Sequence, residues 1–302
     1  MSIINIKAFD WEASLAPEYG GNLFRLAWRG RELLRTPPSS AALRETPSVY
    51  GIPIQFPPGR IDGGKFDFEG NHYQLPINEP ERGNHLHGLV LSAQWSLLAQ
   101  SASRVRIGIR YGKESPEFSG FPFDFELILE YRFTPNEVIQ TLEVRNCGKL
   151  PMPCGIGFHP IFIAPQRLRV DALNWRWEIL QPRLLATGKK LPWDSFDPRN
   201  WFHYSELNFS RQFPATPGIH AAQLDYGDFE LRYEVDPRFH NWYLWNDHPQ
   251  SGFIAIEPNS NVSGGFNLPL PHCETGVFSI NPGENIVLKS QLVIATNRPV
   301  AI

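Results

Sequence analysis

Short runs in which apolar and polar residues alternate recur along this chain, and most of them end in a turn signal built from glycine, proline or asparagine. Alternation with a period of two places successive side chains on opposite faces of an extended strand. The sequence therefore predicts many strands, each with one buried face, joined by short turns such as Asn281-Pro282-Gly283. The predicted strands occupy residues 105–111, 123–129, 139–144, 229–235, 242–245, 252–257 and 286–294.

The high proline content argues against long helices and long uninterrupted strands in this chain. Of 302 residues, 28 are proline and 24 are glycine, and proline interrupts helices and central strands alike. Only Ala41–Val49 is predicted to form one or two helical turns, and residues 181–217, rich in Pro, Trp and Asp, are predicted to be a long ordered loop. No linker or internal repeat divides the sequence. We therefore expect an all-β fold, a large antiparallel β-sandwich, with residues 1–302 in a single domain.

Charge and cysteine content exclude several classes of partner. The net charge is −3 and no run of Lys or Arg occurs, which argues against binding to nucleic acid or to an anionic membrane. Charged residues interrupt Met1–Leu15, so the apolar block of a signal peptide is missing. The three cysteines, Cys147, Cys154 and Cys273, match no CxxC unit and are expected to be reduced. We expect a cytoplasmic protein, a monomer or a homodimer, with no nucleic-acid or membrane partner.

Three segments combine ionisable side chains with unusual local sequence, namely 84–88 (NHLHG), 157–162 (GFHPIF) and 255–261 (AIEPNSN). On a strand, His85 and His87 share one face, as histidine ligands of zinc often do. No neighbouring Cys, Asp or Glu offers a third ligand, so we expect no metal. The abundant aromatic residues (9 Trp, 9 Tyr and 21 Phe) suit either a sandwich core or stacking against the apolar face of a sugar.

His159 and Glu257 leave two interpretations open when each is taken alone. His159, between glycine, proline and aromatic residues, is either a hydrogen-bonded core histidine or a functional group. Glu257 follows the apolar run 253–256, where a buried carboxylate is costly unless it is paired or functional. Enzymes that act on sugar rings need an acid and a base, expected here on opposite sides of one pyranose. A histidine and a carboxylate would supply them.

The ordered set of segments resembles the galactose mutarotase (aldose 1-epimerase) family, particularly its shorter bacterial-type members. The resembling segments are 51–61 (GIPIQFPPGRI), 84–88, 155–162 (GIGFHPIF), 256–258 (IEP) and 281–284 (NPGE), and they span most of the chain. The resemblance implies a large antiparallel β-sandwich and a sugar mutarotase that interconverts α and β anomers of a hexose. The departures are Leu89-Val90 after Gly88 and Ile161 after Pro160, which suggest a divergent member.

The resemblance also implies roles for individual residues. His159 is similar to the family's general acid and Glu257 to its general base, while Arg60 and His87 resemble its substrate-binding pair. A substrate-binding Asp is usual between the acid and base segments. The best-placed match here is Glu206, in Glu206-Leu207-Asn208-Phe209, and Asp225 is a second candidate. Opening and closing a hemiacetal requires one proton donor and one acceptor, so no cofactor and no metal are expected.

Other functions remain open at the level of sequence. A hexose-6-phosphate mutarotase would need further cations near the sugar's C6 end, and Arg82, Arg176 and Lys65 are the candidates. A non-catalytic carbohydrate-binding protein on the same scaffold would be favoured if His159 or Glu257 were absent, and both are present. A glycoside hydrolase would need paired acidic residues at its cleft, which a His/Glu pair fits less well.

Overall fold

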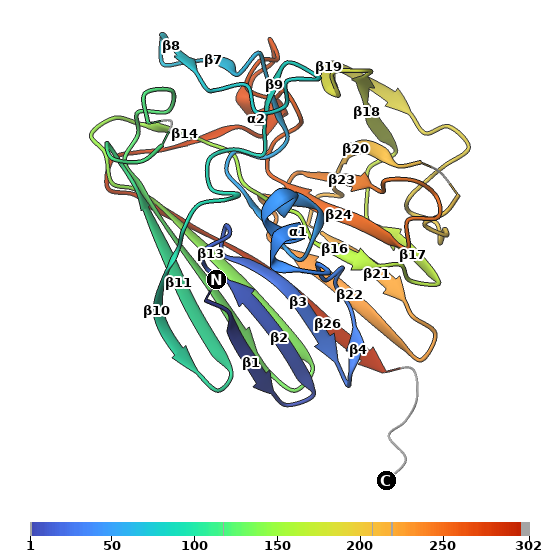
Figure 1. Ribbon diagram of the computed structural model, residues 1–302. Coiled ribbons are helices and arrows are strands. Elements are labelled where there is room, and N and C mark those ends of the chain that lie inside the picture. Colours follow the sequence, from blue (N-terminus) through green and yellow to red (C-terminus); the bar gives the residue numbers. More distant parts are fainter. Residues whose placement is uncertain (1, 117, 207, 219, 297–302) are drawn as a thin grey trace.

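Antiparallel pairing organises the part of the chain that the structure describes. The computed structural model describes residues 2–116, 118–206, 208–218 and 220–296, and every ladder between its named strands is antiparallel. The fold class expected from the sequence is therefore confirmed, and Figure 1 shows it as layers of strands.

Three larger sheets hold most of the strands. The eight-stranded sheet runs, in spatial order, β10 (Ser96–Ser101), β11 (Arg104–Tyr111), β12 (Phe125–Phe133), β13 (Glu137–Asn146), β26 (Asn285–Thr296), β22 (Phe229–Val235), β21 (Ala221–Asp225) and β17 (Arg167–Val170). The four-stranded sheet runs β1 (Ile4–Ala8), β2 (Trp11–Ala16), β3 (Asn22–Trp28) and β4 (Arg31–Glu32). The six-stranded sheet runs β20 (Ser210–Pro214), β23 (Asn241–Trp245), β24 (Phe253–Asn259), β15 (Gly157–Phe158) and β5 (Ile54–Gln55), with β16 (Ile161–Ile163) also paired to β24.

Two-stranded sheets and short helices complete the described chain. The two-stranded sheets are β6 (Arg60–Asp62) with β9 (Asn84–Leu86), β7 (Lys65–Phe68) with β8 (Asn71–Gln74), β14 (Met152–Cys154) with β25 (Phe278–Ile280), and β18 (Trp175–Leu180) with β19 (Leu185–Pro192). The helices are α1 (Ser40–Glu45), a 3₁₀ turn (Pro47–Val49) and α2 (His272–Thr275). No helix among the described residues is long and apolar enough to cross a membrane.

The four-stranded sheet packs against the eight-stranded sheet, and in Figure 1 its blue strands lie in front of the larger sheet. Trp28 of β3 lies 5.1 Å from Phe229 of β22 between ring centroids. Trp11 of β2 donates its indole N–H to the carbonyl of Thr134, 2.9 Å away in the turn between β12 and β13. Buried aromatic rings contribute large apolar area, and the bonded indole loses no hydrogen bond on burial.

Strand β12 shows how the alternating sequence produces the core. Every second side chain from Phe125 to Phe133 is buried, and the residues between them are partly or fully exposed. Phe125 stacks on Tyr111 of β11 at 4.6 Å and lies 4.7 Å from Phe56, which follows β5. The same ring therefore joins the eight-stranded sheet to the sheet that carries the candidate site.

The sequence located some elements well and missed others. The predicted strand 229–235 matches β22, and the short helix predicted within Ala41–Val49 corresponds to α1 and the 3₁₀ turn. The prediction that 181–217 is a long loop was wrong, because β19 and β20 lie within it. Strand β19 carries its own turn residues, including Gly188 and a final proline, so its pairing with β18 is not visible as alternation.

Candidate active site

The ladder around β24 places His159 opposite Glu257. Strand β15 pairs Gly157 with Asn259, and β16 pairs Ile161 with Ala255 in the same register. Midway between these two pairs, His159 lies between Gly157 and Ile161, and Glu257 lies opposite it between Ala255 and Asn259. Pro160 separates β15 from β16 because proline has no N–H to donate to a ladder. The break leaves the His159 side chain beside the carboxylate of Glu257.

His159 and Glu257 are in direct contact. The Nε2 atom of His159 lies 3.1 Å from Oε1 of Glu257, and only 5% of each side chain is exposed. Burial raises the pKa of Glu257 to about 8, although Gln55, Arg60 and Asn259 act in the opposite direction. Burial also lowers the pKa of His159 to about 4, and the charge of Arg60 adds to this effect. At neutral pH the free pair therefore holds one proton between its two members.

This arrangement differs from the expectation of an acid and a base on opposite sides of a pyranose. The two groups are adjacent on one wall instead. Adjacency suits the hemiacetal opening that the sequence resemblance implies, because the ring oxygen and the anomeric hydroxyl of an aldose are attached to the same carbon. Two neighbouring groups can then face both oxygens at once.

Arg60 begins β6, which pairs with β9 and sets Arg60 opposite Leu86. His87 follows directly and adopts a φ of 60°, and Gly88 adopts a φ of 77°. A side chain at Gly88 would lie 2.0 Å from the carbonyl oxygen of Phe56, so this position requires glycine. The left-handed turn ends the strand alternation and brings the ring of His87 to 5.3 Å from that of His159. Strain of this kind often marks a functional site.

The turn also separates the two histidines of the His-x-His pattern. His87 lines the pocket, and burial followed by the neighbouring His159 and Arg60 holds its pKa well below the usual value. His85 does not line the pocket, and its Nδ1 lies 2.8 Å from the carbonyl oxygen of Pro76. Within the described residues, no three His, Cys, Asp or Glu side chains gather as metal ligands would.

His159, Glu257, Arg60 and His87 line one pocket of about 280 Å³. The size suits a monosaccharide, and Trp245 supplies an aromatic surface 6.3 Å from the His159 ring. Polar side chains complete the wall, and Nδ1 of His87 and Oδ1 of Asn259 are buried with no partner among the described residues. Unpartnered buried polar atoms at a pocket wall are candidates for hydrogen bonds to a ligand. The polar and aromatic residues that complete the lining include Arg82, Ser210, Gln212, Tyr243, Trp245 and Asp247.

The structure does not bring Glu206 to this pocket. Glu206 is exposed, and its carboxylate accepts a hydrogen bond of 2.7 Å from the backbone N–H of His203. Asp225 is also elsewhere, paired with Arg167 at 2.8 Å. The expectation for Glu206 therefore needs correction. Asp247, two residues after β23, is the carboxylate between the segments of His159 and Glu257 that lines the pocket, and no sequence signal singled it out.

The fold and the site together define a class of protein, a β-sandwich with a polar pocket in whose wall a histidine and a glutamate are in contact. The family of the chain follows from comparison. The aldose 1-epimerase family model matches residues 10–292, and the chain belongs to this family. Membership places it among isomerase-type enzymes.

Two relatives and two solved structures are similar to this chain. The chain is 24% identical over 286 residues to Escherichia coli K12 protein YphB, covering 90% of this chain and 92% of that one. It is 26% identical over 249 residues to Escherichia coli K12 protein YihR, covering 82% and 72%. A galactose mutarotase-like protein from Clostridium acetobutylicum superposes with a TM-score of 0.90 at 23% identity, covering 97% and 95%. A GalM/aldose epimerase homologue from C. elegans superposes with a TM-score of 0.82 at 17% identity, covering 98% of this chain and 99% of that one. The two structures show a shared fold.

Proposed function

We propose that this protein is a mutarotase that interconverts the α and β anomers of a free hexose, with no cofactor. The observation that carries this proposal is the direct contact of His159 Nε2 with Glu257 Oε1 on the wall of a monosaccharide-sized pocket. Family membership supports the reaction class. The three cysteines are free, which supports the further proposal that the protein works in a reducing compartment such as the cytoplasm.

The proposed reaction needs only proton transfers. The carboxylate of Glu257 takes the proton of the anomeric hydroxyl, and His159 gives the proton on Nε2 to the ring oxygen as the C1–O5 bond breaks. The open-chain aldehyde rotates about C1–C2, and the same transfers in reverse close the ring on the other face. Burial favours the form of the pair with the shared proton on Glu257. The reactive form has this proton on His159 instead, so the two forms contain the same number of protons. The reactive form is reached when the shared proton crosses the 3.1 Å contact.

Arg60 and His87 are proposed to bind ring and hydroxyl oxygens of the sugar, since both line the pocket beside the acid–base pair. The partly buried ring of Trp245 is proposed to pack against the apolar face of the pyranose. Asp247 replaces Glu206 as the proposed carboxylate partner of a sugar hydroxyl.

Charge pairing favours a neutral sugar over a sugar phosphate. Of the three candidate cations, Arg82 lines the pocket and Arg176 and Lys65 do not. Arg82 already contacts Glu79 at 3.2 Å and Glu81 at 3.0 Å. Arg60 is paired with Glu79 as well, at 2.7 Å. A phosphate would have to compete with these carboxylates for both guanidinium groups.

The direct test follows the optical rotation of freshly dissolved α-glucose, α-galactose and their 6-phosphates with the protein present. Faster equilibration of at least one free hexose than in buffer is the expected result. Acceleration confined to the 6-phosphates would instead favour the sugar-phosphate alternative. Binding without acceleration of any of the four would favour the non-catalytic carbohydrate-binding alternative.

The dependence on pH follows from the shared proton. Below about pH 4 both groups are protonated and no base remains, whereas above about pH 8 both are deprotonated and no acid remains. We therefore expect kcat/KM for a free hexose to be highest between these values and to fall on both sides. The measurement is the catalysed rate after subtraction of the buffer rate at each pH. A rate that keeps rising above pH 8 would contradict a shared proton.

A further inference from the structure

A buried glutamate outside the family-derived set of site residues stands directly behind Arg60. Glu79 lies in the loop between β8 and β9, and only 3% of its side chain is exposed. The loop closes on itself, because Glu79 and Asn84 exchange backbone hydrogen bonds of 3.1 and 3.3 Å. The Nδ2 atom of Asn84 also donates to the Glu79 carboxylate at 3.0 Å. These hydrogen bonds within the loop hold the Glu79 carboxylate in place independently of its contacts with arginine.

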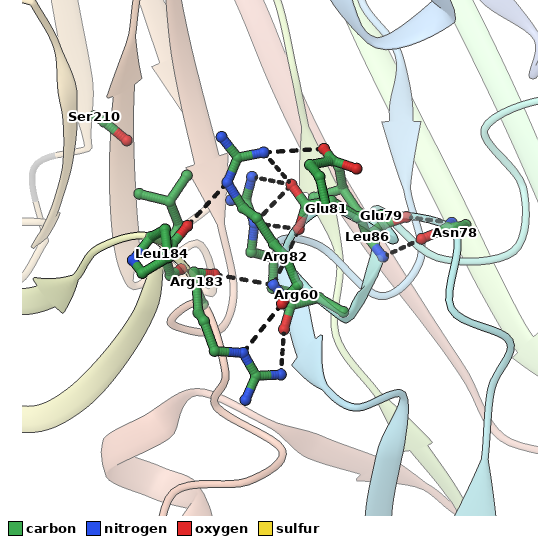
Figure 2. A network of polar contacts seen from close by, with 12 residues as sticks. Arg60, Asn78, Glu79, Glu81, Arg82, Leu86, Arg183, Leu184 and Ser210 are labelled. Carbon is green, nitrogen blue, oxygen red and sulfur yellow. Dashed lines mark hydrogen bonds and ion pairs between the residues drawn. The ribbon is translucent and has the colours of Figure 1, made fainter.

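Both carboxylate oxygens of Glu79 accept hydrogen bonds from Arg60. The Nε atom of Arg60 donates to Oε2 at 2.8 Å, and Nη2 donates to Oε1 at 2.7 Å. Figure 2 shows this pair at the centre of a network that also includes Arg82. A two-point contact fixes the plane of a guanidinium group as well as its position. Burial alone would raise the pKa of Glu79, but hydrogen bonds from Arg60 and Asn84 lower it overall, so Glu79 carries a full negative charge at neutral pH.

We propose that Glu79 is a positioning residue of the active site, which aims the Arg60 guanidinium at the sugar and balances its charge beside the His159–Glu257 pair. This inference rests on the proposed mutarotase function and deepens it. Arg60 is the group that would touch substrate, and Glu79 acts through it. Glu79 does not itself line the pocket.

The charge balance matters because Arg60 acts on both members of the acid–base pair. Its positive charge lowers the pKa of Glu257 and that of His159. The charged and titratable groups around Arg60 and the pair come from several elements, namely Glu79 and Arg82 of the β8–β9 loop, His87 after β9, Tyr243 of β23, Asp247 after β23, and His159 and Glu257 themselves. Among them Glu79 is the carboxylate bonded to Arg60. If Glu79 lost its negative charge, nothing bonded to Arg60 among the described residues would offset the positive charge of Arg60. The pKa values of His159 and Glu257 would then both fall.

The experiment compares three full-length variants with the wild-type protein, using the free hexose that the wild type equilibrates. Glu79→Gln removes the charge and one of the two acceptors. We expect KM to rise about tenfold, the loss typical of one charge-assisted hydrogen bond, with a smaller change in kcat. We also expect the alkaline fall of kcat/KM to move to lower pH. A residue that only stabilised the loop would not move this pH limb.

Two further variants separate position from charge and from the loop itself. Glu79→Asp keeps the charge but shortens the reach, so we expect a raised KM with the pH limb where the wild type has it. Glu81→Gln removes the same charge from the same loop, but Glu81 is 63% exposed and contacts Arg82. This matched control is expected to keep the wild-type KM and pH limb.

Each outcome decides a separate point. Wild-type KM and pH limb in both Glu79 variants would overturn the positioning role while leaving the mutarotase function intact. No acceleration by the wild-type protein would overturn the proposed function, and the positioning role with it. Circular dichroism of every variant shows whether it folds. If Glu79→Gln does not fold, the KM of Glu79→Asp decides whether Glu79 positions Arg60.

Discussion

The Glu257→Gln variant is expected to lose about 10²- to 10⁴-fold in kcat for mutarotation, the usual contribution of a positioned acid or base. Glutamine has the same shape and can keep a contact near Nε2 of His159, which is 3.1 Å from Oε1 in the wild type. It cannot accept the anomeric proton. The loss should therefore appear in kcat more than in KM, and optical rotation with a free hexose measures both.

The same variant should not be less stable at neutral pH. The pKa of Glu257 in the folded protein, about 8, lies above the ordinary value of 4.5, so the folded state holds a proton that the unfolded state releases. The stability associated with this group is fully present below the ordinary pKa and is lost as pH rises toward 8. Glutamine does not titrate, so we expect Glu257→Gln to melt at or above the wild-type temperature at pH 7–8. An active Glu257→Gln variant would refute the assignment of the base.

Strand content was predictable because burial on one face leaves a period of two in the sequence. Strand β22 is an example, since its buried and partly exposed residues alternate without interruption from Phe229 to Val235. Elements without that asymmetry were harder to find or to delimit. Every residue of β10 is exposed, and this strand was not predicted; every residue of β24 is buried, and it was predicted as the run 252–257. The end of β24 was placed at Glu257, two residues early, because Pro258 normally ends a strand.

The site depended on information of a different kind. His159 and Glu257 were joined through family resemblance, because nothing local in the sequence reports a register between β15, β16 and β24. Asp247 carries no local pattern, and Trp245 was predicted only as part of the strand 242–245. The path of β23 brings both residues to the pocket. Glu206 was chosen by spacing from the acid and base segments. Spacing does not determine where an irregular loop directs a side chain, and Glu206 instead bonds the backbone of His203.

Combining His159→Asn with Glu257→Gln is expected to cost no more than the worse of the two single changes. Each single variant removes one end of a shared-proton pair and leaves the other without its partner at 3.1 Å. Groups that act as one unit lose most of their effect at the first substitution, so their losses do not multiply. We expect each single variant to lose about 10²- to 10⁴-fold in kcat, and the double variant to fall within the same range.

The measurement is kcat for the two single variants and the double variant with one free hexose, with circular dichroism to confirm folding. The pH profile gives an independent readout of the same pair. The bell with limbs near pH 4 and 8 should disappear in all three variants, because none retains both groups that share the proton. Losses that multiply in the double variant would mean that His159 and Glu257 contribute independently. In that case their contact in the free protein would be a resting arrangement that the bound sugar separates.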